Sequence, residues 1–159
     1  EMNKKFDAAS AELDAYIRSL NQQYAGADIH CSLDFRCPLG SYKYITTQYG
    51  QGGHKGVDLA APQGTPIYAA ADGVVTVAAY HYSYGNYVSI YHGSADDGNT
   101  YATLYAHMSQ APSVSTNQQV KKGDLIGYVG NTGYSFGNHL HLELRVNGNR
   151  TNPLSYIPH

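Results

Sequence analysis

The sequence predicts a mainly β protein, an antiparallel β-sandwich or hybrid barrel, preceded by one N-terminal α-helix. The 159 residues include 16 tyrosines and 17 glycines but only 14% charged residues, a composition typical of β structure. Beyond Tyr42 the helical period of apolar residues disappears. Short apolar stretches punctuated by glycine and asparagine follow at the regular spacing of an antiparallel sheet.

Size and charge exclude several classes of protein. A chain of 159 residues is long enough for one domain with a sizeable core. Its formal net charge of −2 provides no strong positive field, so we expect no nucleic-acid partner. The apolar runs are too short for a membrane-spanning helix. Because the sequence starts at Glu1, we treat it as a fragment or a processed product, and its start says nothing about secretion.

The predicted helix covers residues 1 to about 24 and ends at Gly26. Its apolar residues recur at alternating intervals of four and three: Met2, Phe6, Ala9, Leu13, Tyr16 and Leu20. Two interpretations stay open, the end of a longer coiled coil or a helix packed on the domain. We divide the chain into residues 1–35, helix and linker, and residues 36–159, the β domain.

The predicted strands follow the helix in order. They are residues 44–49, 67–70, 73–80, 86–92 and 100–108, two short strands around Gly123, and residues 138–145. Pro62 to Pro66 form a turn, and Asp72-Gly73 predicts a hairpin between the second and third strands. Cys31 and Cys37 are close enough for a disulfide in an oxidising compartment, which we favour over two unrelated buried thiols.

The strand at 138–145 alternates most clearly. One face carries His139, His141, Glu143 and Arg145, and the other carries Leu140, Leu142, Leu144 and Val146. The apolar face should pack in the core and hold the two imidazoles rigidly on the opposite side. Glu143 is expected to pair with a nearby cation.

Two further segments carry similar side chains. In residues 100–108 one face should present Tyr101, Thr103, Tyr105 and His107, and the other Ala102, Leu104, Ala106 and Met108. In an extended segment His54, Gly56 and Asp58 point together, and Gly56 leaves room for an ion between its neighbours. Tyr82, Tyr84 and Tyr134, in loops rich in Gly and Ser, are candidates for lining a substrate groove.

Two imidazoles and a carboxylate are a suitable ligand set for one catalytic Zn²⁺ with an open fourth position. His54, Asp58 and one of His139 and His141 can supply this set. The remaining histidine and His107 are then available for acid–base chemistry beside a water molecule. His30, His81, His92 and His159 lie outside these motifs and are expected to be ordinary surface or structural residues.

These motifs resemble those of the M23 peptidases, the lysostaphin or LytM-type zinc endopeptidases of bacterial cell walls. The resemblance is carried by His54-x-x-x-Asp58, Tyr105-Ala106-His107 and His139-Leu140-His141, and by the segments 56–66, 84–86, 120–127 and 130–133. It covers about residues 36 to 157. Met108 stands where the family usually has Leu, and Asn138 where it often has Pro.

The resemblance implies a mostly antiparallel β domain with a narrow groove. It implies that His54, Asp58 and His141 bind zinc and that His107 and His139 form the catalytic pair. His139 is then the favoured proton acceptor, and His107 the favoured stabiliser of the oxyanion. The implied substrate is the peptide part of peptidoglycan, in the cell wall or periplasm of a bacterium.

Two alternatives stay open. One is a non-catalytic module of the same fold that binds the wall or regulates hydrolases, although family members of that kind have lost some of the five site residues. The other is a biotinyl- or lipoyl-carrier-like domain, because Val120 to Val129 resemble a lysine hairpin. Residues 1–24 carry no motif residue, so we expect them to be dispensable for chemistry and to serve an upstream coiled-coil or regulatory partner.

Overall fold

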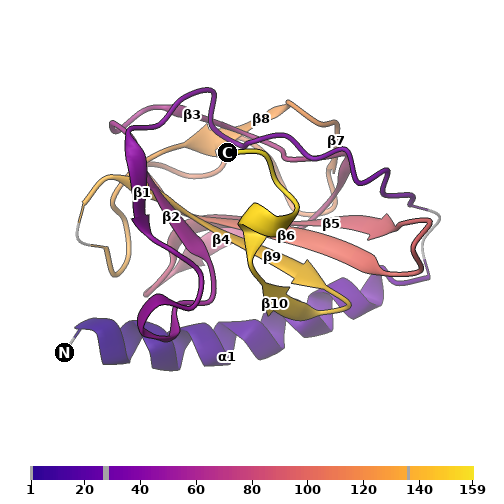
Figure 1. Cartoon of the computed structure of the whole chain (residues 1–159), viewed down its shortest axis with the longest axis horizontal. Coiled ribbons are helices and arrows are strands. Elements are labelled where there is room, and N and C mark those ends of the chain that lie inside the picture. Colours follow the sequence, from indigo (N-terminus) through magenta and orange to yellow (C-terminus); the bar gives the residue numbers. More distant parts are fainter. Residues whose placement is uncertain (1, 27–28, 136) are drawn as a thin grey trace.

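The computed structural model describes residues 2–26, 29–135 and 137–159 (Figure 1). Helix α1 spans Met2–Gln23. The strands are β1 Tyr44–Thr47, β2 Val57–Ala60, β3 Pro66–Tyr68, β4 Gly73–His81, β5 Gly85–Ser94, β6 Thr100–Met108, β7 Gln119–Val120, β8 Leu125–Tyr128, β9 His139–Val146 and β10 Asn149–Thr151. Short 3₁₀ helices lie at Gln51–Gly53 and Pro153–Ser155.

The strands form two antiparallel sheets. The larger sheet has the order β1-β2-β9-β6-β5-β4-β7, with β10 paired to β9, and the smaller one consists of β3 and β8. β9 lies between β2 and β6 in the larger sheet, as the order shows. The predicted fold class, mainly antiparallel β with one N-terminal helix, is confirmed.

One local prediction about strand pairing was wrong, and one tight turn was not predicted. Asp72-Gly73 does not make a hairpin, because β3 pairs with β8 while β4 pairs with β5 and β7. Gly73 has no positive φ, so it is not needed for a turn. It is needed for close packing, because a Cβ there would lie 2.5 Å from the Tyr91 carbonyl oxygen. A real tight turn was missed at Asn147 and Gly148, both with positive φ, which joins β9 to β10.

The main core lies on the predicted apolar face of β9. Leu140, Leu142 and Leu144 are buried there with Ile67 of β3 and Ile126 of β8. The core therefore fills the space between the larger sheet and the smaller one, and it fixes the direction in which β9 presents its histidines.

Helix α1 covers the opposite face of the larger sheet (Figure 1). Leu13 and Ile17 pack against Tyr84, Tyr87 and Leu104, so the helix is packed on the domain. No described helix contains an apolar stretch long enough to cross a bilayer.

The buried face of α1 is rotated from the predicted one. Ala9, Leu13 and Ile17 are buried at intervals of four, whereas the predicted Tyr16 is 50% exposed. The helix packs on a sheet and not on a second helix, so the four-three pattern of a coiled coil, which includes Tyr16, does not describe its contact face. The side chains of Met2 and Phe6, which belong to the predicted pattern, lie outside the described part of the molecule.

The expected disulfide between Cys31 and Cys37 is not formed, and both residues are free thiols. Cys31 is buried in the main core, where burial raises the pKa of its thiol. Cys37 is partly buried and packs against the same core. The short separation of the two cysteines permitted a bridge, but each thiol is used as a small apolar group.

The packing of α1 predicts a stability difference between neighbouring residues. Ile17→Ala should lower the free energy of unfolding by about 2–5 kcal/mol, because a fully buried side chain is lost. Tyr16→Ala is the matched control and should cost less than about 0.5 kcal/mol. Urea unfolding followed by circular dichroism measures both. Equal, small effects would mean that α1 is detached from the sheet in solution.

Candidate metal centre

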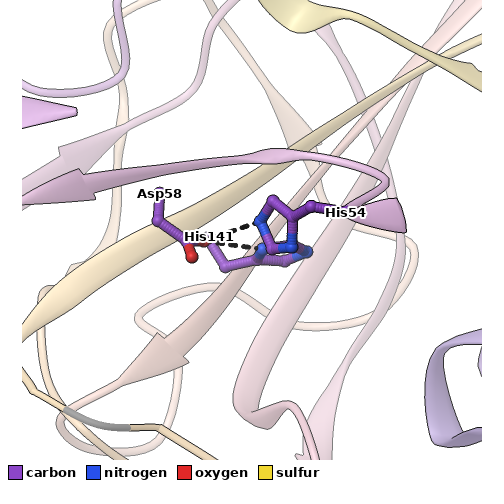
Figure 2. A group of neighbouring side chains, drawn as sticks. All are labelled: His54, Asp58 and His141. Carbon is purple, nitrogen blue, oxygen red and sulfur yellow. Dashed lines mark hydrogen bonds and ion pairs between the residues drawn. The ribbon is translucent and has the colours of Figure 1, made fainter. Parts of the chain in front are cut away.

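Strand pairing brings the predicted ligands together. β2 runs antiparallel to β9, with Asp58 directly opposite His141. His54 follows the 3₁₀ turn Gln51–Gly53 and precedes β2, with extended backbone angles. Figure 2 shows the two imidazole rings and the carboxylate turned toward one another.

The donor atoms of His54, Asp58 and His141 all lie within 4.8 Å of one another. Asp58 Oδ1 is 2.9 Å from His141 Nδ1 and 3.2 Å from His54 Nε2. Zinc bonds to nitrogen and oxygen of about 2.0–2.2 Å place tetrahedral ligands about 3.3 Å apart. The donor set and its spacing therefore fit one zinc ion with a further position open for water or substrate.

The charges in this cluster attract one another. Burial alone would raise the pKa of Asp58, but hydrogen bonds from His141 and His54 hold it far below its usual value. Burial alone would lower the pKa of His141, whereas its bonds to Asp58 and Glu143 raise it to about 9. The Asp58 carboxylate is thus ionised and attracts positive charge, which a bound cation supplies equally well.

Glu143 lies behind His141. Its Oε2 atom is 2.9 Å from His141 Nε2, so the two ring nitrogens face two different carboxylates. A carboxylate on the second nitrogen of a metal-binding histidine fixes the orientation and tautomer of the ring. Glu143 also pairs with Arg145 at 3.5 Å and Arg150 at 3.7 Å, which confirms the expected pairing with cations.

The sequence suggested that the space beside Gly56 is left for an ion, but atoms of the protein occupy this space. A Cβ atom there would lie 2.5 Å from the Leu142 carbonyl oxygen and 2.9 Å from His141 Cε1. The space beside Gly56 is therefore filled by β9 and by the ring of His141. The absence of a side chain lets the segment from His54 to Asp58 approach β9 closely enough to complete the cluster.

His107 reaches the centre through a β-bulge. Between the pairs Val88–Tyr105 and Asn86–Met108, β6 contains one residue more than β5, and His107 has φ 62°. Its ring centroid lies 4.9 Å from that of His139 and 6.0 Å from that of His141. The prediction that His107 shares a face with Tyr101 and Tyr105 was wrong, because those two side chains point into the main core.

His107 and His139 are held in the same way. Nδ1 of His107 donates to the Thr132 carbonyl at 2.7 Å, and Nδ1 of His139 donates to the Gly137 carbonyl at 2.8 Å. A carbonyl oxygen only accepts, so each neutral ring carries its proton on Nδ1 and has Nε2 as its basic atom. Burial lowers the pKa of both rings, that of His107 to about 3.

Several residues near the centre were missed or misassigned from the sequence. Tyr84, a candidate for a substrate groove, is buried and donates to Glu143 at 2.6 Å. Tyr82 and Tyr134 are in edge contact with each other, with ring centroids 5.9 Å apart, and their role in a substrate groove stays a prediction. Arg150 lies close to the centre because β10 pairs with β9, and only recognition of the Asn147-Gly148 turn would have placed it there.

His92 is a structural residue, as expected. It is fully buried and bonded to the Asp72 carbonyl and the Thr103 hydroxyl. His81 accepts hydrogen bonds from the backbone N–H groups of Ser83 and Tyr84. Neither belongs to the metal cluster found in the described part of the chain.

A His–Asp–His cluster, with the buried His107 and the partly buried His139 beside it, is an arrangement typical of metal-dependent hydrolases. The model of peptidase family M23 matches residues 52–153, and the chain belongs to this family.

The sequence is similar to characterised bacterial proteins. It is 49% identical over 102 residues to the DD-carboxypeptidase/endopeptidase Mpg of Neisseria meningitidis, covering 64% of this chain and 22% of Mpg. It is 41% identical over 125 residues to the murein hydrolase activator NlpD of Escherichia coli, covering 78% of this chain and 31% of NlpD. The chain therefore spans less than a third of either relative.

Two solved structures share the fold. An M23 protein of Pseudomonas aeruginosa superposes with a TM-score of 0.75 at 27% identity, covering 98% of this chain and 62% of its own. A zinc-containing peptidase of Vibrio cholerae superposes with a TM-score of 0.65 at 33% identity, covering 75% of this chain and 39% of its own. The first match extends over nearly the whole chain and so includes helix α1.

The ligand cluster predicts one tightly bound zinc per chain, which His141→Ala should abolish because two ligands hold zinc poorly. Elemental analysis after gel filtration measures the metal. His30→Ala is the matched control, since the His30 side chain is 59% exposed and lies outside the cluster. Unchanged zinc in the His141→Ala protein would remove this residue from the ligand set.

Proposed function

We propose that this chain is a zinc-dependent endopeptidase that hydrolyses peptide bonds in the stem peptides or cross-bridges of peptidoglycan. The observation that carries the proposal is the convergence of His54, Asp58, His107, His139 and His141 on one centre in a chain of family M23. Mpg, a DD-carboxypeptidase/endopeptidase, supports the substrate class.

When bound by His54, Asp58 and His141, zinc supplies a Lewis acid that polarises a carbonyl and lowers the pKa of water. His139 is suited to take a proton from the attacking water, because its basic Nε2 lies 3.6 Å from the ligand atom Asp58 Oδ1. The same group can return the proton to the departing amine.

His107 has a different role from His139 in the proposal: it stabilises the oxyanion that forms at the scissile carbon. Its ring is anchored by the Thr132 carbonyl and stacks on Tyr84 with centroids 6.3 Å apart, so it is already oriented before substrate binds. Because Nδ1 donates to that carbonyl, the neutral ring presents a basic Nε2 to the centre, and a hydrogen bond from Nε2 to the oxyanion requires the imidazolium form, with the second proton taken up from solvent water.

A non-catalytic role as a regulator of other hydrolases is the alternative, and the similarity to the activator NlpD favours it. The complete set of five site residues favours catalysis instead. In either case the site of action is extracytoplasmic, in the periplasm or the cell wall. Within the proposal residues 36–159 form the peptidase domain, and residues 1–24 contact any upstream partner.

Digestion of purified peptidoglycan tests the proposal against its alternative. Zinc-loaded protein should release fragments with new peptide termini, identified by mass spectrometry, and His141→Ala protein or a chelator should abolish them. If zinc-loaded protein creates no new termini but accelerates a separate peptidoglycan amidase, the alternative is correct.

The proposed roles of His107 and His139 predict a separation between metal binding and turnover. His107→Ala and His139→Ala should each lower turnover by about a hundredfold or more, the scale of a lost general base or oxyanion donor. Each variant should keep its zinc and melt within a few degrees of the parent, since neither residue is in the ligand set. A His139→Ala protein without zinc would mean that His139 and His141 have exchanged roles.

A further inference from the structure

A buried polar network joins helix α1 to the metal centre. Ser10 and Asp14 project from the helix toward Tyr84, Arg145 and Arg150, the three residues that surround Glu143. Glu143 and Arg145 are only 1% and 2% exposed. Charged groups buried to this degree require specific partners, so the contacts from the helix are part of what keeps them in place.

The first path runs through Tyr84. Its hydroxyl donates to Glu143 Oε2 at 2.6 Å and lies 2.9 Å from the Ser10 hydroxyl. The Tyr84 hydroxyl has one proton and uses it in the hydrogen bond to Glu143. In the bond between Ser10 and Tyr84, the Ser10 hydroxyl is therefore the donor. Arg150 in turn donates to the Ser10 hydroxyl. Ser10 thereby connects the helix to the oxygen atom that contacts His141.

The second path runs through the arginines. Arg145 donates to the Asp14 carboxylate through Nη1, and its Nη2 lies 3.5 Å from Glu143 Oε1. Arg150 Nε lies 3.4 Å from Asp14 Oδ1. Asp14 therefore holds both guanidinium groups beside Glu143, and the two paths together fix both oxygens of that carboxylate.

The position of Glu143 decides which nitrogen of His141 meets the metal. With Nε2–H donating to Glu143, Nδ1 is the nitrogen of His141 that faces Asp58 and the ligand cluster, and it is the atom that gives up its proton when a metal binds. If the Glu143 carboxylate turned away, the ring would lose this bond and could rotate or change tautomer. Outer partners of metal-binding histidines affect metal affinity for this reason.

We propose that helix α1 is a structural part of the metal centre, in which Ser10 and Asp14 act as positioning residues for the ligand His141 through Tyr84, Glu143 and the two arginines. The proposal rests on the zinc centre of the proposed function. It replaces the expectation that residues 1–24 are dispensable for chemistry. The helix contributes no ligand to the metal. According to the proposal, displacement of α1 from the sheet nevertheless lowers zinc affinity.

The test measures zinc affinity of metal-free protein by competition with a chromogenic chelator, independently of turnover. Glu143→Gln should weaken zinc binding by about a hundredfold, and Ser10→Ala and Asp14→Asn by about tenfold each, within the range known for outer partners of metal ligands. Ser19→Ala and Glu12→Gln are matched controls on the exposed side of α1 and should leave affinity unchanged. Nitrogen NMR of the His141 ring in zinc-loaded protein should show one tautomer in the parent and loss of that single tautomer in the network variants.

Leu13→Ala separates positioning from simple stability, because Leu13 packs on the sheet and contributes no side-chain polar group. It should lower the melting temperature and leave zinc affinity within twofold of the parent. The proposal is overturned if Ser10→Ala and Asp14→Asn bind zinc like the parent, or if the affinities of all variants simply follow their melting temperatures.

The outcomes separate this inference from the proposed function. Parent protein that binds zinc but does not cleave peptidoglycan contradicts the endopeptidase activity, while the affinities still test the network. Parent protein that binds no zinc contradicts both, since there is then no metal centre to position.

Discussion

The alternation of β9 is the constraint on which the rest of the structure depends. Leu140, Leu142 and Leu144 are anchored in the core, which forces His139, His141 and Glu143 onto the opposite face. A slip of one residue would exchange the two faces, burying histidines among leucines, so the core itself fixes the register. Pairing with β2 then brings Asp58 to His141, and pairing with β6 brings Ala106 opposite the same residue.

The ligand cluster was accessible from the sequence because it depends on short-range regularities. His139 and His141 follow the period of a strand, and His54 and Asp58 lie within five residues of each other in one short segment. Their assembly required only that these two strands pair. The family motif supplied the choice of His141 over His139, and Asp58 lies closer to His141 than to His139 in the structure.

Features set by tertiary contacts could not be predicted in the same way. The bulge at His107 inserts a residue that strict alternation cannot anticipate, and it moves one side chain to the other face. The rotation of α1 toward Ile17 is set by the side chains of the sheet that the helix contacts, Tyr84, Tyr87 and Leu104, whose positions depend on strand pairing. The partners of Glu143 are His141 and Arg145 on its own strand together with Tyr84 and Arg150 from other segments, so the charge pattern indicated pairing but not with which residues.

Electrostatic balance explains why α1 is polar on part of its buried side. Glu143 would be costly to bury alone, and burial alone would raise its pKa. Bonds to His141 and the charges of Arg145 and Arg150 instead lower this pKa to about 2. Two arginines beside one glutamate leave an excess of positive charge, which Asp14 compensates from the helix. The sheet and the helix are thus complementary in charge as well as in shape.

The two free thiols have a practical consequence for work with this protein. Since no bond between Cys31 and Cys37 is needed to close the structure, folding requires no oxidant and is compatible with a reducing cytosol as well as an oxidising medium. The two sulfur atoms also differ in accessibility, because Cys31 is 3% exposed while Cys37 is only partly buried. A maleimide dye should therefore attach selectively at Cys37, giving a spectroscopic label at the start of the β domain without introducing a new cysteine.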